Sequence, residues 1–192
     1  MQIYAWNILA EWSLVAGCIF VMRANGLGLA NIGQGLGKSY VTVTLLLIVI
    51  ATFVVIRLSR KKARSSTKEA ALKQAAEQVK RIVPTSAAER GMFVLVALTA
   101  GICEEFLYRG WLLNFAGVGM GSLWLGLLVS SVIFGLAHAY QGRRGVIGAG
   151  GLGLVLGLLF LLCRSLIPIQ VVHAAIDLNN GLALGKLAQE KS

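Results

Sequence analysis

Two adjacent carboxylates and one arginine interrupt an otherwise apolar stretch of this chain. Glu104 and Glu105 follow a hydrophobic run that begins at Gly91, and Arg109 comes four residues after Glu105. A charged side chain near the centre of a bilayer costs at least ~2.5–3.5 kcal/mol, so a carboxylate in such a segment is a functional candidate. On a helix Glu105 and Arg109 are i, i+4 neighbours and can pair. Glu104 then projects about 100° away, where it can face another helix.

The chain's two histidines lie in later apolar runs, and each belongs to a four-residue spacing. One run contains Phe134-x-x-x-His138, and the other contains His173-x-x-x-Asp177 with Asn180 further along the same helical face. A carboxylate beside a histidine can fix its tautomer and raise its basicity. Glutamate and histidine, with no cysteine or serine placed as a nucleophile, favour activated-water chemistry over a covalent acyl-enzyme.

Composition assigns the chain to the integral membrane proteins. Of its 192 residues 57% are hydrophobic and 14% are charged, and the mean hydropathy is +0.76, values that do not fit a soluble domain of this length. The 23 glycines suit transmembrane helices, which use small residues for close packing. The three cysteines include no Cys-x-x-Cys pair, which argues against a disulfide framework or a thiolate metal site.

The hydrophobic runs predict an all-α polytopic transmembrane helical bundle in a single integral membrane domain, residues 1–192. About six spans are expected: Ile3–Met22, Val41–Leu58, the segment after Ser86 that carries Glu104, Ser122–His138, Val146–Cys163 and Ile169–Leu187. Between the second and third spans, residues 66–83 predict an amphipathic cytoplasmic helix that Pro84 stops. We expect it to lie on the membrane surface or against the bundle. Pro168 is expected to break the chain before the sixth span.

The net charge of +10 is concentrated in one segment. Ten of the 18 lysines and arginines fall between Arg57 and Arg90, and a second basic loop contains Arg143 and Arg144. Loops rich in Lys and Arg mark the cytoplasmic side, so both basic segments predict a multi-pass protein with both termini in the cytoplasm, and we expect it in the cell membrane. Anionic lipid headgroups of the bilayer are therefore the expected partner of this charge, and nucleic acid is not.

A glycine-rich stretch also fits a nucleotide-binding pattern but does not support that function. Gly148 to Gly153 match G-x-G-x-x-G, which is meaningful only between a strand and a helix. Here the match lies inside an apolar span. Gly145, Ala149, Gly153 and Gly157 instead form a four-residue ladder typical of packed transmembrane helices.

Taken in order, the motifs Glu104-Glu105-x-x-x-Arg109, Phe134-x-x-x-His138 and His173-x-x-x-Asp177 resemble those of the CPBP family of intramembrane proteases. That family includes the CAAX prenyl endopeptidases and members linked to bacteriocin processing and immunity. The resemblance covers roughly residues 91–185 and implies a catalytic core at 91–187. It implies an endopeptidase that hydrolyses a peptide bond of a membrane-embedded or lipidated protein or peptide.

The resemblance also implies roles for the individual residues. Glu104 would activate the water, His138 would help to position it, and His173 with Asp177 would stabilise the oxyanion, while Glu105 and Arg109 complete the site. The family commonly has Asn where this chain has Asp177. An ionised aspartate would repel an oxyanion, so Asp177 must be protonated or must serve to orient His173.

Two alternatives stay open at this point. Glutamate and two histidines match the ligand set of a catalytic zinc site, but the chain has no His-Glu-x-x-His pair. Using Glu104 or Glu105 as a ligand also conflicts with the base role or the pairing with Arg109. We therefore expect no cofactor, with zinc as the alternative. The second functional hypothesis is a non-hydrolytic membrane scaffold or bacteriocin-immunity protein. A proton-coupled transporter is third, because the chain shows no inverted repeat.

Overall fold

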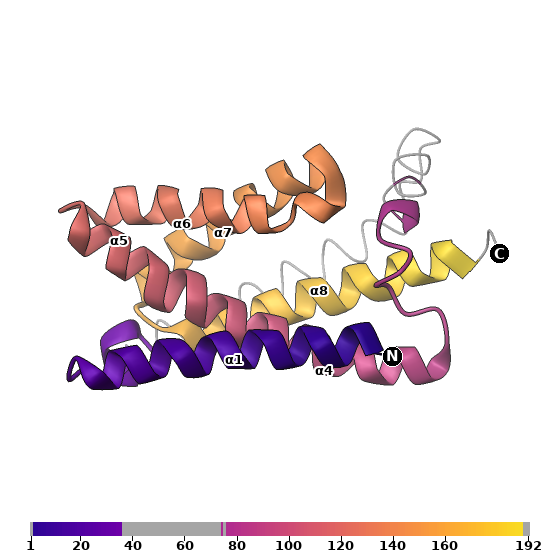
Figure 1. Ribbon diagram of the computed structural model, residues 1–192. Coiled ribbons are helices and arrows are strands. Elements are labelled where there is room, and N and C mark those ends of the chain that lie inside the picture. Colours follow the sequence, from indigo (N-terminus) through magenta and orange to yellow (C-terminus); the bar gives the residue numbers. More distant parts are fainter. Residues whose placement is uncertain (1, 36–73, 75, 190–192) are drawn as a thin grey trace.

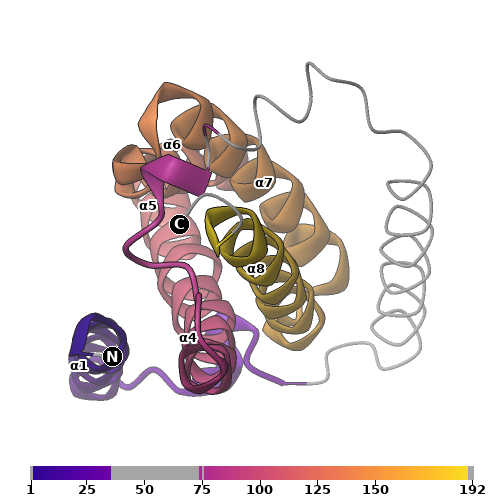
Figure 2. The same ribbon diagram turned by 90° about the vertical axis from the view of Figure 1, so that its right-hand side faces the viewer.

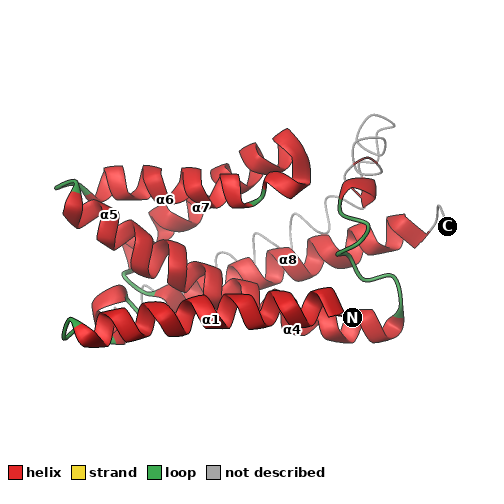
Figure 3. Ribbon diagram, viewed as in Figure 1, coloured by secondary structure: helices red, strands yellow, loops and turns green. Residues whose placement is uncertain are grey.

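The computed structural model describes residues 2–35, 74 and 76–189, and every regular element in this part of the chain is a helix (Figure 3). The predicted all-α bundle is confirmed. The expected span Val41–Leu58 and most of the amphipathic helix lie outside the described residues. The longer helices are α1 (Gln2–Ala24), α4 (Ala87–Glu105), α6 (Leu123–Ala137), α7 (Gly142–Cys163) and α8 (Leu166–Gln189). The shorter elements are η1 (Leu29–Ile32), η2 (Phe106–Leu112), α5 (Leu113–Gly119) and η3 (Ala139–Gln141).

Three helical stretches of the described chain are long and apolar enough to cross a membrane: Gln2–Ala24, Ala87–Gly119 and Ala139–Cys163. The helix α6 is apolar but shorter. The helix α8, which contains the predicted sixth span, has 24 residues but is not one of these three stretches. His173, Asp177 and further polar side chains lower its hydropathy. Its length is therefore the feature that supports a membrane crossing.

The site is carried by one continuous helical rod that contains α4, η2 and α5. The rod begins at a capping box in which Ser86 Oγ accepts from the Glu89 N–H and the Glu89 carboxylate accepts from the Ser86 N–H. The element η2 is a π-helix, and the Leu113 N–H that closes it donates to the Tyr108 carbonyl five residues back. Such π-segments are rare and are frequent at functional sites. This one begins directly after Glu105 and was not predicted.

The helix α4 lies between α1 and α8, as the end-on view of Figure 2 shows. In Figure 1, α1 and α4 run side by side, while α5 leads to the pair formed by α6 and α7. Close approach of α4 to α8 depends on Gly101. A Cβ atom there would lie 2.6 Å from the Gln170 carbonyl oxygen and 2.7 Å from the Ala174 Cβ. Side chains four residues further along α4 can therefore reach α8.

Small residues also bring α6 and α7 together. A Cβ atom at Gly135 would lie 2.8 Å from the Val146 carbonyl oxygen, and one at Gly153 would lie 3.3 Å from the Ser131 Cα. Gly153 therefore lies in this interface, as the predicted glycine ladder requires. At Gly145 an added Cβ atom would lie nearest to the Gln141 side chain, so a role of Gly145 in this interface stays a prediction.

One predicted helix boundary near Pro168 differs from the structure: the fifth span ends at Cys163 as predicted, but the next helix begins before Pro168. The helix α7 ends where Arg164 adopts a left-handed conformation with φ 52°. The chain then enters α8 at Leu166, so Pro168 lies in the first turn of that helix and does not break it. Proline is tolerated there because N–H groups of the first turn have no intrahelical acceptor.

The described end of the predicted amphipathic helix packs against the bundle. Residues 76–78 are helical and the chain turns at residues 79–82, so the helix ends earlier than Pro84. Val79 and Val83 form a buried cluster with Ala188 of α8. The helix was predicted to lie on the membrane surface or against the bundle, and its described end lies against the bundle.

Candidate active site

Glu105, Arg109 and His173 form a buried polar cluster between the α4 rod and α8. Arg109 Nη1 donates to Glu105 Oε1 at 2.8 Å, and His173 Nδ1 lies 2.7 Å from the same oxygen. All three residues are at most 1% exposed. The predicted pairing of Glu105 with Arg109 is confirmed. The contact between Glu105 and His173 was not predicted from the sequence.

The Arg109 guanidinium is enclosed by α6 and α7. Its Cζ lies 4.4 Å from the centre of the Phe134 ring, a cation–π contact. Gly153 leaves room for it, because a Cβ atom there would lie 3.1 Å from Arg109 Nη2. Among the described residues, Arg109 Nη2 and Glu105 Oε2 have no hydrogen-bond partner. The pair is therefore held by one hydrogen bond and by tight packing.

Glu104 faces the other ring nitrogen of His173. Glu104 Oε2 lies 3.8 Å from His173 Nε2, and Asp177 Oδ2 lies 3.5 Å from the same nitrogen. The Glu104 and Asp177 side chains are 20% and 35% exposed, whereas the Glu105 side chain is fully buried. The cluster therefore has a closed inner end at Glu105 and an accessible outer end at Glu104 and Asp177.

His138 lies beside this cluster at the C-cap of α6. The Phe134 ring contacts both histidines, with centroid distances of 4.6 Å to His138 and 5.7 Å to His173. His138 Nδ1 lies 2.8 Å from the Phe134 carbonyl oxygen. A carbonyl only accepts, so Nδ1 carries the proton and Nε2 of the neutral ring is an acceptor. No hydrogen bond or ion pair within the described ranges joins His138 to Glu104.

Glu105 determines which chemistry His173 can perform. The Nδ1–H of His173 donates to the Glu105 carboxylate, which fixes the tautomer of the ring. In the neutral ring, Nε2 is then an acceptor that faces Glu104, and only the doubly protonated ring can donate from Nε2. The closest orienting contact to His173 thus comes from Glu105. Asp177 lies instead on the side of the ring where a reacting group could bind.

The expectation of a metal-free site, with zinc as the alternative, stays a prediction. Over residues 2–35, 74 and 76–189, no group of three His, Cys, Asp or Glu side chains is arranged to hold one. His173 Nδ1 is engaged by Glu105 and His138 Nδ1 faces a backbone carbonyl, so in each ring Nε2 is the nitrogen that is left to contact water or an ion.

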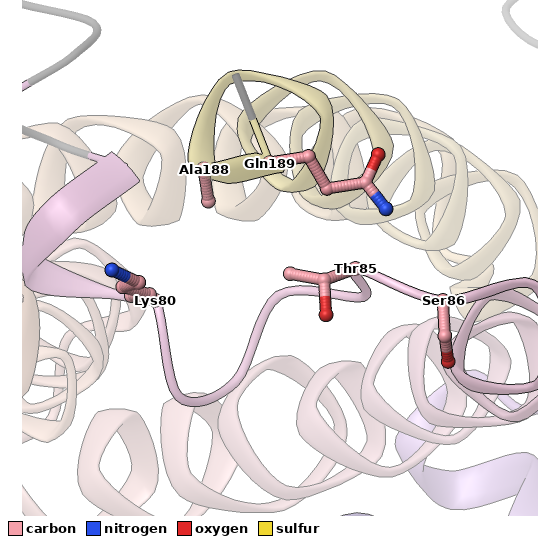
Figure 4. A pocket seen from close by; sticks show the side chains of 5 residues that line it. All are labelled: Lys80, Thr85, Ser86, Ala188 and Gln189. Atoms are coloured by element: carbon pink, nitrogen blue, oxygen red, sulfur yellow. The ribbon is translucent and has the colours of Figure 1, made fainter. Parts of the chain in front are cut away.

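A pocket at the opposite end of α4 and α8 is separate from this cluster (Figure 4). It lies between the chain that precedes α4 and the last turn of α8. Its lining residues are Lys80, Thr85, Ser86, Ala188 and Gln189. It includes none of the predicted site residues.

One further buried carboxyl is not part of the sequence motifs. Glu11 of α1 is 9% exposed, and its Oε2 has no hydrogen-bond partner among the described residues. The signal that could have identified it is the one that identified Glu104, an ionisable side chain within a membrane span. Glu11 has no neighbouring motif in the sequence, so residue spacing alone does not single it out.

One known family matches the part of the chain that contains the three motifs around Glu104, His138 and His173. The family model described as type II CAAX prenyl endopeptidase Rce1-like matches residues 86–179, about half of the chain. The chain belongs to the Rce1-like family. The match begins at the N-cap of α4, ends on α8, and contains all six residues of the predicted site. No curated protein and no solved structure matches the chain.

Membership of the Rce1-like family confirms the resemblance to the CPBP family. It makes this membrane protein an intramembrane endopeptidase of the general CAAX type. The first described helix, α1, lies outside the matched residues and so contributes features that the family pattern does not include.

Proposed function

We propose that this Rce1-like protein hydrolyses a peptide bond with a water molecule that Glu104 activates. The observation that carries the proposal is Glu104 Oε2, which is buried and without a hydrogen-bond partner among the described residues. It lies 3.8 Å from His173 Nε2. That distance is too long for a direct hydrogen bond but suits a water that contacts both groups. Glu104 takes a proton from this water as the water oxygen attacks the carbonyl carbon.

The second half of the reaction returns that proton. Attack gives a tetrahedral oxyanion, to which a doubly protonated His173 donates from Nε2 while Glu105 holds its Nδ1–H. Glu104 then gives its proton to the departing nitrogen, and the C–N bond breaks to give a carboxylic acid and an amine. Asp177 contributes to the oxyanion side only when protonated, and His138 Nε2 helps to position the water.

The substrate is proposed to be a membrane-embedded or lipidated protein or peptide. The family model that matches the chain is described as a CAAX prenyl endopeptidase, and the outer end of the site is accessible at Asp177, which is 35% exposed. We place that end toward the cytoplasm and both termini on the same side in the cell membrane, because segments rich in Lys and Arg usually lie on the cytoplasmic side. Residues 1–192 then form one integral membrane domain with a catalytic core at 91–187.

A comparison of membrane proteomes tests this function. Cells expressing the wild-type protein should contain new peptide termini that are missing from cells expressing Glu104→Ala at the same level. The matched control is Glu77→Ala, because Glu77 is an exposed carboxylate that pairs only with Lys80 within the described ranges. A cleavage pattern that is the same for wild type and Glu104→Ala would contradict the proposal and favour the scaffold hypothesis.

Chelation tests the metal-independent form of the mechanism. The activity of the purified protein should survive exhaustive treatment with phenanthroline, and elemental analysis should find far less than one zinc ion per chain. A catalytic zinc site needs three deprotonated protein ligands, which the described residues do not assemble. Loss of cleavage on chelation, recovery on addition of zinc, and a lower zinc content in His138→Ala would together establish the zinc alternative.

A further inference from the structure

Gln170 of α8 links this helix to α4 close to the active site. Its side chain is buried, and its Nε2 donates to the Ile102 carbonyl oxygen of α4 at 3.3 Å. Gln170 lies about one helical turn before His173, and Ile102 lies about one turn before Glu105. The turns that carry this link therefore adjoin those that carry the 2.7 Å contact between His173 and Glu105.

Two links between neighbouring turns restrict how α8 lies on α4. The helices run in opposite directions, because Gly185 of α8 lies against Pro84, while Gly101 of α4 lies against Ala174. The amide link therefore crosses the link between the histidine and the carboxylate. One link allows α8 to turn about it, whereas two crossed links restrict both the rotation of α8 and its position along α4. Loss of the amide link should therefore move the histidine relative to the carboxylate.

A second amide holds Gln170 in the orientation that this link needs. Gln170 Nε2 also donates to Gln34 Oε1 at 3.2 Å, and Gln34 Nε2 lies 3.5 Å from Gln170 Oε1. The Ile102 carbonyl only accepts, so the amide nitrogen of Gln170 must face α4. Both N–H groups of Gln170 then have acceptors, and its oxygen faces the amide nitrogen of Gln34. A buried amide that loses such partners leaves unsatisfied polar groups, which is costly.

The segment that carries Gln34 is itself attached to the start of α8. The Leu166 N–H donates to the Gly33 carbonyl oxygen at 2.9 Å. Ser165 Oγ donates to the Gly35 carbonyl oxygen. The backbone is thus held on both sides of Gln34, and its side chain extends to α8 from a fixed position.

We propose that Gln170 is a positioning residue of the active site and that Gln34 holds its amide in place. Of the described residues, Gln170 forms hydrogen bonds with Gln34 and Ile102 and with none of the site residues. It acts through α8 by setting where His173 meets Glu105. The inference rests on the proposed function, because this histidine donates to the oxyanion. Gln34 lies outside the residues that match the family, so a segment beyond the family pattern supports the site.

Kinetics of Gln170→Met test the proposal. Methionine keeps the length of the side chain and removes its hydrogen bonds to Gln34 and Ile102. The full-length protein in liposomes is given a peptide identified by the proteome comparison. We expect kcat to fall about tenfold or more with KM changed by less than about twofold, because a displaced donor weakens the transition state and not peptide binding. The matched control Gln189→Met changes an exposed glutamine in the last turn of α8 and should cleave like the wild type.

A spectroscopic measurement tests the same proposal without catalysis. The chain has two histidines, so NMR of protein that contains isotope-labelled histidine shows two sets of ring signals, and His138→Gln assigns them. The Nδ1–H proton of His173, which is bonded to a buried carboxylate, should resonate far downfield. Gln170→Met should shift this signal and leave those of His138 unchanged. A role in stability alone would leave the His173 signal of the folded protein where it is in the wild type.

Variants of Gln34 separate the orientation of the amide from the packing around it. Gln34→Glu keeps an acceptor for Gln170 Nε2 and should retain most of the activity. Gln34→Leu removes that acceptor and should lower kcat about threefold or more, with a shift of the His173 signal in the same direction as in Gln170→Met. If Gln170→Met gives no folded protein, this comparison of the two Gln34 variants decides the question.

Three results would overturn the inference while the proposed function stands. They are wild-type kcat in Gln170→Met, a lower thermal stability of Gln170→Met with an unchanged His173 signal, and equal activity of Gln34→Glu and Gln34→Leu. Failure of the proposed function is a separate result, in which Glu104→Gln cleaves as well as the wild type. The His173 signal then still shows whether Gln170 places the ring, because that measurement needs no substrate.

Discussion

Glu104→Gln should abolish peptide hydrolysis, with kcat lower by a factor of about 10²–10⁴, the usual contribution of a general base. The amide keeps the shape of the side chain but cannot take a proton from water. Because Glu104 Oε2 makes no hydrogen bond to a described residue and its side chain is 20% exposed, the change should leave the fold intact. The measurement is single-turnover cleavage of a peptide identified by the proteome comparison, together with the yield and thermal stability of the purified protein in detergent.

The control for this variant is Glu77→Gln, which removes a carboxylate at the surface. Its cleavage rate should equal that of the wild type. Full activity of Glu104→Gln would show that another group activates the water. A large loss of folded protein in Glu104→Gln would show instead that the carboxylate contributes to assembly.

Arg109→Ala should be the most destabilising substitution in the site. Removing one partner of a buried ion pair costs ~3–5 kcal/mol, because the remaining charge is stranded. Here the stranded group is Glu105, which is completely buried and also holds His173. The contact of Arg109 with the Phe134 ring is lost as well. Thermal unfolding in detergent should show a much lower midpoint for Arg109→Ala than for Glu104→Gln.

A double variant distinguishes a stranded charge from lost packing. Arg109→Met fills part of the space and strands Glu105, whereas Arg109→Met combined with Glu105→Gln removes both charges. The double variant should be more stable than the single one, although its activity stays low because His173 loses its carboxylate partner. Equal and small stability losses in Arg109→Ala and Glu104→Gln would contradict this division of roles.

Local patterns in the sequence were sufficient for the features that depend on neighbouring residues. The pairing of Glu105 with Arg109 follows from helical spacing, and the prediction that Glu104 faces another helix holds because its carboxylate lies near α8. The start of α6 after Ser122 also agrees with the predicted span boundary. Each of these features depends on a few residues of one segment, so the local sequence is sufficient to predict it.

The contacts between helices could not be predicted in the same way. Glu105 and His173 are 68 residues apart in the chain, and their contact depends on the close approach of α4 to α8 at Gly101. A glycine in an apolar run indicates close packing, but it does not indicate which helix packs there. The burial of Glu11 depends likewise on how α1 packs against α4. The start of α8 was missed because a proline can either end a helix or be tolerated in the first turn of the next one.

The π-helical turns of η2 allow one helical rod to serve two partners with different faces. Hydrogen bonding to the fifth residue back adds about one residue to a turn and so shifts the phase of all side chains that follow. Before the shift, α4 presents its inward face to α8 and α1; after it, α5 presents its own inward face to α6. The inward-facing residues of α4 and those of α5 therefore need not lie on the same side of the rod. A substitution in α5 that suits α6 can therefore leave unchanged the face that α4 presents to α8 and α1.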